Sequence, residues 1–199
     1  MTNRPGPRFQ MWIDAVGGYL VCLSDEILIG QAIPESVADV PIFGDLSRRH
    51  AVLRREGESY VIVPHAKTLV EQQAIDGSRY LRDGDELQFG ASVSMRFRQP
   101  HPLSHSCRLE FTSPHRTQPH ADAVVVLANS CVLGPSETSH VVCRHWTRDL
   151  VLAREGQDLR CHTAGVMEVD GKDVKQKSAI NLNSRICGED FCVSLEQIN

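Results

Sequence analysis

Short apolar runs separated by polar turns recur along the whole chain, and their order is repeated once. Four blocks of the first half have counterparts in the same order in the second half: residues 18–30 with 122–134, 47–63 with 146–162, 70–75 with 169–174, and 85–97 with 184–196. The second pair of blocks shares the tripeptide Arg-Glu-Gly. Because four matched blocks in one order are hard to attribute to chance, the sequence predicts a tandem duplication.

The apolar runs are rich in Val, Ile, Leu and Phe, and turn residues interrupt them about every 8 to 12 positions. No longer window keeps a helical period, apart from a single turn around residues 34–38. This texture is typical of an antiparallel β-sandwich. We therefore predict an all-β protein made of two tandem antiparallel β-sandwiches.

The duplication divides the chain into two domains. We predict a first domain at residues 1–98, a linker rich in Pro, Ser and His at residues 99–106, and a second domain at residues 107–199. The second domain is expected to open with a strand at residues 107–111. A polar loop follows at residues 112–122, and we expect this loop to be mobile.

Charge and hydropathy exclude several classes of partner. The chain has 199 residues and a formal net charge of −4, with no long run of one sign. Nucleic-acid binding normally requires a basic stripe, so we expect no nucleic-acid partner. No apolar run approaches the roughly 20 residues that a membrane-spanning helix needs, so we expect no membrane partner. The start of the chain also lacks the apolar core of a secretory signal, which favours a cytoplasmic protein.

Seven cysteines are scattered along the chain without a Cys-x-x-Cys pair. Most of them lie inside apolar, strand-like runs, where a cysteine behaves as a small apolar side chain. We therefore favour buried free thiols over disulfides, metal ligands or redox chemistry.

Catalytic and metal-binding patterns are weak. Cys161 and His162 put a thiol next to an imidazole, but adjacent residues of a strand point to opposite faces of the sheet. Four histidines fall in the linker and the long loop without a standard zinc spacing, at positions 101, 105, 115 and 120. We predict a non-enzymatic protein with no catalytic residues, no cofactor and no metal.

Several short motifs of the first half carry a resemblance to a known family. The motifs are Ile29-Gly30, Ser47-x-x-His50, Thr68-x-Val70 with the turn at residues 71–72, and LRDGDELQFG at residues 81–90. With these motifs the segment from about Phe9 to Phe97 resembles a forkhead-associated (FHA) domain. The resemblance implies a β-sandwich that binds phosphothreonine in partner proteins.

The resemblance also implies a binding chemistry that can be followed residue by residue. In the family, an arginine directly after Ile-Gly reaches the phosphate, and the serine of Ser-x-x-His donates a hydrogen bond to it. The histidine holds the loop from beneath, and an asparagine of a Val-Asn-Gly turn fixes the peptide backbone. This chain keeps Ser47 and His50, but it carries Gln31 in place of the arginine and Glu71-Gln72 in place of Asn-Gly.

The two replacements predict weak phosphate binding. Gln31 donates hydrogen bonds but brings no charge and no two-pronged fork. A hydrogen bond to a charged group contributes about 1.5–3 kcal/mol, which is roughly ten- to a hundredfold in affinity. A carboxylate at Glu71 would in addition repel a dianionic phosphate.

Two neighbouring arginines offer a replacement charge. Arg48 or Arg49 could place its guanidinium over the same loops, and Arg48 is our first choice because family members often carry a basic residue directly after the serine. The alternative is that both are solvated surface residues on and beside an exposed strand. His50 is expected to be structural, with its imidazole satisfied by backbone groups.

The second half has drifted further from these motifs. Pro135 follows Gly134 and has no side-chain donor, while the shared Arg-Glu-Gly aligns Trp146 with the serine and Asp149 with the histidine. A phosphate pocket is therefore not expected there. Trp146 is either a core residue or an exposed anchor for a partner, and we favour the core.

We therefore predict a protein–protein interaction module with a role in signalling. Its N-terminal sandwich would bind a partner loop at the apical face with weak or no phosphate dependence. Two alternatives stay open: phosphothreonine binding with Arg48 or Arg49 replacing the arginine lost at position 31, and a purely structural role in a larger assembly. The predicted contact residues are Gln31, Ser47, Arg48, Arg49, Thr68 and Glu71, supported by Gly30 and His50.

Overall fold

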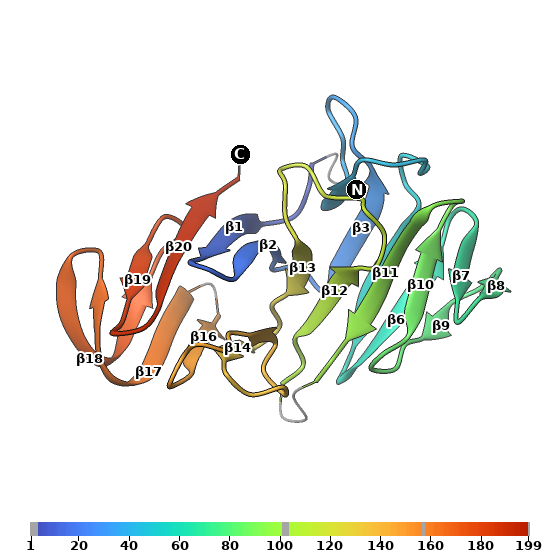
Figure 1. Cartoon of the computed structure of the whole chain (residues 1–199). Helices are drawn as coiled ribbons and strands as arrows, with labels where there is room; N and C mark the ends of the chain where they lie inside the picture. Colours follow the sequence, from blue (N-terminus) through green and yellow to red (C-terminus); the bar gives the residue numbers. More distant parts are fainter. Residues whose placement is uncertain (1–3, 101–103, 157, 199) are drawn as a thin grey trace.

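The computed structural model describes residues 4–100, 104–156 and 158–198, and the regular elements in these ranges are all β-strands (Figure 1). The prediction of an all-β protein is confirmed. Within the same ranges no helix is long and apolar enough to cross a membrane.

A five-stranded sheet forms one layer of the first sandwich. Its order is β4-β3-β5-β6-β9, in which β3 and β4 run parallel and the other neighbours run antiparallel. Residues of β5 alternate between buried and partly exposed, so this sheet has one face on a core and one toward solvent. The strands are β3 (Glu26–Gln31), β4 (Val40–Ile42), β5 (Ala51–Glu56), β6 (Ser59–Pro64) and β9 (Arg79–Tyr80).

The remaining strands form one continuous 15-stranded sheet. Its order is β15-β14-β16-β17-β19-β20-β1-β2-β13-β12-β11-β10-β7-β8, and β18 pairs with β17 beside this path. The first half of the chain supplies β1 (Arg8–Ile13), β2 (Gly17–Cys22), β7 (Thr68–Val70), β8 (Gln73–Ile75), β10 (Glu86–Phe89) and β11 (Val93–Arg98). The second half supplies β12 (Cys107–Phe111), β13 (Ala123–Val126), β14 (Ser130–Gly134), β15 (Val141–Val142), β16 (Leu150–Glu155), β17 (Asp158–Val169), β18 (Lys172–Ile180), β19 (Arg185–Cys187) and β20 (Cys192–Gln197).

The two halves of the chain exchange their first hairpins. The hairpin of β1 and β2 lies beside the last strand, β20, whereas the hairpin of β12 and β13 lies beside β11 of the first half (Figure 1). At the centre of the sheet, β2 and β13 run parallel and join the two groups of strands. The sheet therefore passes from one half of the molecule to the other without a break.

Two hydrophobic cores lie on opposite faces of the central strands. Leu20 and Cys22 of β2 belong to the first core, which also contains the inner face of the five-stranded sheet. The alternate residues Tyr19 and Val21 belong to the second core, together with side chains of β14 to β20. Because successive side chains of a strand point to opposite faces, one strand serves both cores.

The predicted domain boundaries do not follow these cores. Cys107 and Leu109, expected to open the second domain, pack in the first core, while Phe9 and Met11, expected in the first domain, pack in the second core. The physical reason is that β1 and β12 each pair with a strand of the other half, so burial follows the exchanged hairpins. Residues 101–103 of the predicted linker lie outside the described residues.

The loop at residues 112–122 is bonded to β4, where we expected a mobile loop. The Phe43 amide donates to the carbonyl oxygen of Arg116 at 3.0 Å, and the Gln118 amide donates to that of Pro41 at 2.8 Å. An isolated bridge joins Ile42 to Thr117. These contacts bring the exchanged hairpin to one end of the first sandwich.

The matched sequence blocks form strands with corresponding pairings. Ile29 faces Ala51 in the first half, and the matched residues Leu133 and Leu150 face each other in the second half. In the same way, Val70 faces Leu87 in the first half and Val169 faces Ile186 in the second half. The long strand β17 takes two of these positions, because its first part pairs with β16 and its last two residues pair with β19.

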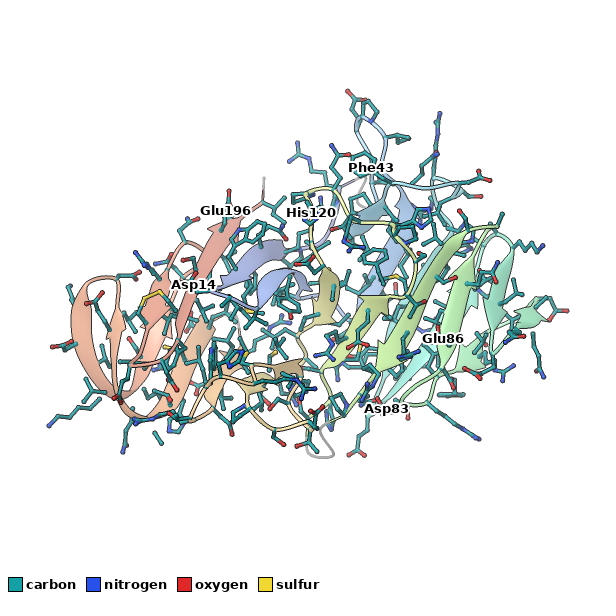
Figure 2. All side chains as sticks on the ribbon, in the orientation of Figure 1. Asp14, Phe43, Asp83, Glu86, His120 and Glu196 are labelled. Atoms are coloured by element: carbon teal, nitrogen blue, oxygen red, sulfur yellow. A yellow bond between two sulfur atoms is a disulfide. The ribbon has the colours of Figure 1, made fainter. Side chains whose placement is uncertain are left out.

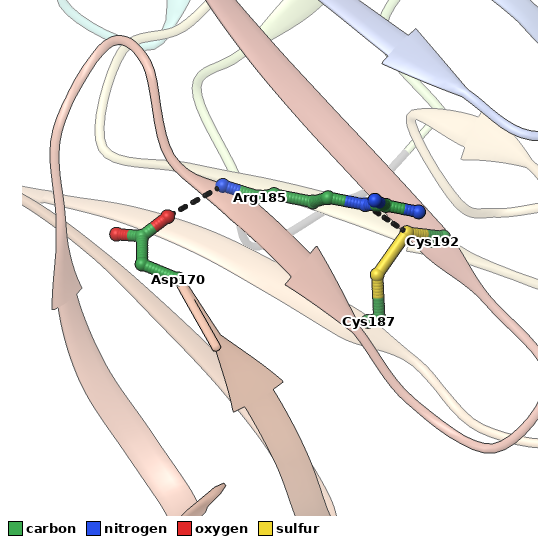
Figure 3. Close-up of a disulfide and its surroundings, with 4 residues drawn as sticks. All are labelled: Asp170, Arg185, Cys187 and Cys192. Atoms are coloured by element: carbon green, nitrogen blue, oxygen red, sulfur yellow. Dashed lines mark hydrogen bonds between the residues drawn. A yellow bond between two sulfur atoms is a disulfide. The ribbon is translucent and has the colours of Figure 1, made fainter. Parts of the chain in front are cut away.

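Two of the seven cysteines depart from the expectation of free thiols. Cys187 and Cys192 face each other across β19 and β20 and form a disulfide (Figure 3). The facing positions of a two-stranded hairpin bring the two sulfur atoms together. The other five cysteines are free and buried, as predicted.

Candidate functional site

Three loops converge at one end of the first sandwich, at the top of Figure 1. They are residues 32–39 between β3 and β4, residues 43–50 between β4 and β5, and residues 65–67 between β6 and β7. We call this end the apical face. The loop at residues 112–122 borders it, because a Cβ atom at Gly44 would lie 3.1 Å from the imidazole of His115.

His50 ties these loops together from beneath, and only 2% of it is exposed. Its Nδ1 atom accepts a hydrogen bond from the Ser47 amide at 3.2 Å, and its Nε2 atom donates one to the carbonyl oxygen of Lys67 at 2.9 Å. Burial lowers the pKa of His50, against a smaller opposite effect of the bond to Lys67, so the neutral imidazole is favoured. His50 therefore serves as a structural link between two apical loops.

The loop that carries Ser47 lies directly on Gly30. A Cβ atom at position 30 would lie 2.9 Å from the carbonyl carbon of Arg48 and would overlap its oxygen. The next residue, Gln31, donates its main-chain amide to the carbonyl oxygen of Ser47 at 3.1 Å. Its side-chain amide donates to the carbonyl oxygen of Gly44 at 3.3 Å, so Gln31 supports the loop with both groups.

Ser47 and Arg48 project from this loop. Both residues are exposed, and in the described part of the chain neither side chain has a hydrogen-bond or ion-pair partner. Arg49, the next residue, lines a hollow of about 470 Å³ together with Glu26 and Asp39. Ser47 and Arg48 are thus exposed neighbours on this loop, whereas Arg49 lines a hollow that neither of them lines.

Thr68 does not reach the surface of the apical face. It is 0% exposed, and its hydroxyl donates a hydrogen bond to the carbonyl oxygen of Ala66 at 2.9 Å. Thr68 therefore stabilises the turn into β7. Because its side chain is buried, it is not the contact residue that we predicted.

Glu71 does not belong to the apical face, because it lies at the other end of β7. Its amide donates to the carbonyl oxygen of Glu86 at 2.9 Å, and its carboxylate accepts from the Glu86 amide at 2.7 Å. Lys67, at the apical end, bonds instead to Gly90. Glu86 and Gly90 are four residues apart along the strand, or about 13 Å. Figure 2 also shows Glu86 well apart from Phe43 of the apical face. Glu71 is therefore not placed to repel a phosphate bound at the apical face.

Asp170 repeats this arrangement in the second half. Its amide donates to the carbonyl oxygen of Arg185 at 3.0 Å, and its carboxylate accepts from the Arg185 amide at 2.8 Å (Figure 3). Both carboxylates therefore fix a turn at the end of a strand.

The turn after β7 predicts a stabilising substitution. Glu71 and Gln72 have φ angles of 51° and 62°, whereas the corresponding turn of the second half has glycine at its second position, Gly171. We expect Gln72→Gly to raise the free energy of unfolding by about 0.5–1 kcal/mol, because left-handed strain of about 1–2 kcal/mol exceeds the entropy cost of glycine. Urea unfolding would measure this gain. Gln73→Gly, in the neighbouring strand, should instead lower the free energy of unfolding. If Gln72→Gly also lowered it, the left-handed conformation of Gln72 would not be a source of strain.

Lys67 and the loop at residues 112–122 are parts of the apical face that sequence reasoning missed. Lys67 is exposed, and its ammonium has no ion-pair partner within the described ranges. His115 and Arg116 come from the exchanged hairpin, where the Arg116 guanidinium lies 5.9 Å from the centre of the Phe111 ring. No local pattern links this loop to β4, so the sequence offered no signal for it.

The corresponding end of the second half is filled by side chains. A Cβ atom at Gly134 would overlap a carboxylate oxygen of Asp149, which takes the place that the Arg48 carbonyl has against Gly30. Trp146 is 5% exposed, and its ring lies 4.9 Å from that of Phe191. The prediction that Trp146 belongs to the core is confirmed.

In the part of the chain that the structure describes, no group of three or more His, Cys, Asp or Glu side chains is placed to hold a metal ion. His101, one of the four histidines considered for such a site, lies outside the described residues.

Comparison with known proteins gives one family match and two similar structures. The FHA domain family model matches residues 27–90. The solved structure titled "Rv0020c_FHA Structure" is 22% identical, with a TM-score of 0.30, and the match covers 43% of this chain and 86% of that one. An N-terminal FHA domain from EssC, a component of the bacterial Type VII secretion apparatus, is 9% identical, with a TM-score of 0.26, and the match covers 94% and 92%. No curated protein matches the chain.

The family match spans β3 to β10 and the three loops of the apical face. It includes Gly30, Ser47 and His50, whose contacts build that face. FHA domains are protein–protein interaction modules and not enzymes. Residues 27–90 of this chain thus match the FHA domain family model.

Proposed function

We propose that the apical face binds a segment of a partner protein through an anionic group, and that Ser47 and Arg48 contact this group. The observation that supports the proposal is the pair of exposed side chains, without partners in the described ranges, on a loop that His50 holds from beneath. A hydroxyl donor beside a free guanidinium suits the oxygens and the charge of a phosphate. Phosphothreonine, which the family binds, is therefore the group we propose.

Gln31 limits how strongly a phosphate would be bound. Its side-chain amide is already bonded to Gly44, and it supplies no charge. Hydrogen bonds to charged groups contribute about 1.5–3 kcal/mol each, so a site with one arginine fewer is weaker by roughly ten- to a hundredfold. Arg48, with Lys67 on the neighbouring loop, would supply the charge, and we propose a real but modest preference for the phosphorylated segment.

The test is capture of peptides from a degenerate phosphothreonine library by the purified chain, beside the same library without phosphate. Affinities of a selected peptide pair are then measured by calorimetry for three variants. We expect Arg48→Ala to remove the preference for phosphate and Gln31→Arg to strengthen phosphopeptide binding by roughly tenfold or more. Arg49→Ala, which removes the same charge from the adjacent residue, should change little because Arg49 lines the hollow beside Glu26 and Asp39.

Two outcomes would replace the proposal. Equal capture of both libraries, unaffected by Arg48→Ala, would favour phosphate-independent binding of a partner loop. Absence of capture from either library would favour a structural role in a larger assembly.

A further inference from the structure

An exposed tryptophan lies near the middle of the long sheet, away from the apical face. Trp12 of β1 is 39% exposed, and it lies opposite Gly18 of β2 and Ser194 of β20. The residues on either side of it in the strand, Met11 and Ile13, point into the second core. Because its cross-strand neighbours are small, the indole is not covered by side chains from the adjacent strands.

The indole ring is held in one orientation. A Cβ atom at Gly18 would lie 2.8 Å from Cε3 of Trp12, so the ring rests closely on the backbone of β2 at a position where only glycine leaves room. Its Nε1 atom donates a hydrogen bond to the carboxylate of Glu196 at 3.2 Å. One face of a fixed aromatic ring is thereby left toward solvent.

Two hollows flank the ring, and both have acidic rims. The first, of about 380 Å³, is lined by Trp12 together with Asp14, His120 and Asp122. The second, of about 620 Å³, is lined by Trp12 with His120 and Glu196. Neither hollow is lined by a lysine or an arginine. In Figure 2, His120 and Glu196 lie above the central strands, and Asp14 lies at the end of β1.

The carboxylates around the ring are mostly uncompensated. Asp14 and Glu196 are exposed and have no ion-pair partner in the ranges that the structure describes. Asp122 accepts the Gly18 amide at 2.9 Å and lies 3.8 Å from Arg116. We call the surface made by Trp12, Asp14, His120, Asp122 and Glu196 the indole surface.

We infer that the indole surface is a second binding site, which takes a basic segment of a partner protein. A lysine or arginine side chain would stack on the open face of Trp12, where cation–π attraction contributes about 0.5–2 kcal/mol. Neighbouring basic residues of the segment would pair with Glu196 on one side of the ring and with Asp14 and Asp122 on the other. The complementary charge selects the occupant, since an acidic or phosphorylated segment would be repelled here.

This site differs from the apical face in its chemistry, although the loop at residues 112–122 contributes to both. The apical face presents Ser47, Arg48 and Lys67, whereas the indole surface presents carboxylates and an aromatic ring. Its residues come from β1 and the turn that follows it, from β20 and from the end of the 112–122 loop, so it exists because of the hairpin exchange.

The experiment is a titration of the full chain with a short arginine homopeptide and with a lysine homopeptide. Calorimetry measures the binding. A glutamate homopeptide and an uncharged Gly-Ser peptide serve as control ligands. The chain has two tryptophans, and Trp146 is buried, so quenching of fluorescence by acrylamide reports on Trp12. We expect the basic peptides to bind and to protect Trp12 from acrylamide, while the control ligands do neither.

Matched variants separate specific binding from general attraction to an acidic protein. Glu196→Gln should weaken binding by about two- to fivefold, whereas Glu168→Gln, which removes the same charge from an exposed residue of β17, should leave it unchanged. Trp12→Phe keeps an aromatic ring in the sheet, so it is less disruptive to the fold than Trp12→Ala. It should also weaken binding less than Trp12→Ala does. Arg48→Ala should have no effect.

Three results would overturn the inference. These are equal losses for Glu196→Gln and Glu168→Gln, no binding of either basic peptide, or protection of Trp12 that rises only with protein concentration. The last result would identify the surface as a contact between copies of this chain.

Discussion

Gly30→Ala is expected to lower the free energy of unfolding by about 1–3 kcal/mol and to abolish binding at the apical face. The added methyl group would overlap the carbonyl oxygen of Arg48, which is a backbone atom and cannot turn aside as a side chain can. Relief requires the loop at residues 43–50 to move away from β3. That movement would break the bonds from Gln31 to Ser47 and Gly44, and it would displace Ser47 and Arg48 together.

The matched control is Gly77→Ala. No atom lies within 4 Å of a Cβ at Gly77, and its φ angle is not in the left-handed range, so this substitution should change stability little. Urea unfolding gives the stability of both variants, and calorimetry with the selected peptide gives their binding. If Gly30→Ala retained wild-type affinity, the loop that rests on Gly30 would not be the binding surface.

The local part of the site could be predicted from the sequence. Gly30 lies in β3, and Ser47 and His50 lie in the loop that leads into β5, the strand that pairs with β3. These contacts are close enough along the chain for their spacing in the sequence to reflect their spacing in the fold. Glu71 could not be placed in this way. The end of β7 that it occupies depends on pairing with β10, and the register of a strand pair is set by contacts distant in the sequence.

The strands could also be predicted, but the exchange of hairpins could not. Apolar alternation indicates which residues are buried, and it does not indicate which strand they are buried against. One signal was present in the central strands: residues 19–22 and 123–126 are unbroken apolar runs, which are typical of strands covered on both faces. A strand with only one face on a core would alternate between polar and apolar residues, as β10 does with its sequence ELQF.

Neither half of the chain is expected to fold without the other. A fragment of residues 1–98 contains the five-stranded sheet but lacks β12 and β13, which supply Leu109, Val124 and Val126 to the first core. It would also expose Phe9 and other residues of β1 that belong to the second core. We expect circular dichroism to show fragments 1–98 and 99–199 largely unfolded alone, and their mixture to regain strand structure and unfold cooperatively.

Phe9→Ala tests the same exchange of hairpins in the intact chain. Phe9 is 0% exposed, and loss of a buried phenylalanine costs about 3–5 kcal/mol. In two independent tandem domains this loss would loosen the first half alone. Because β1 packs in the second core and β2 serves both cores, hydrogen exchange should instead accelerate in β16 at least as much as in β5, with a single unfolding transition. Phe43→Ala, at a residue 54% exposed, is the control and should shift stability by less than about 0.5 kcal/mol. Acceleration confined to β5, or a fragment 1–98 that unfolds cooperatively by itself, would mean that the first hairpin packs with its own half.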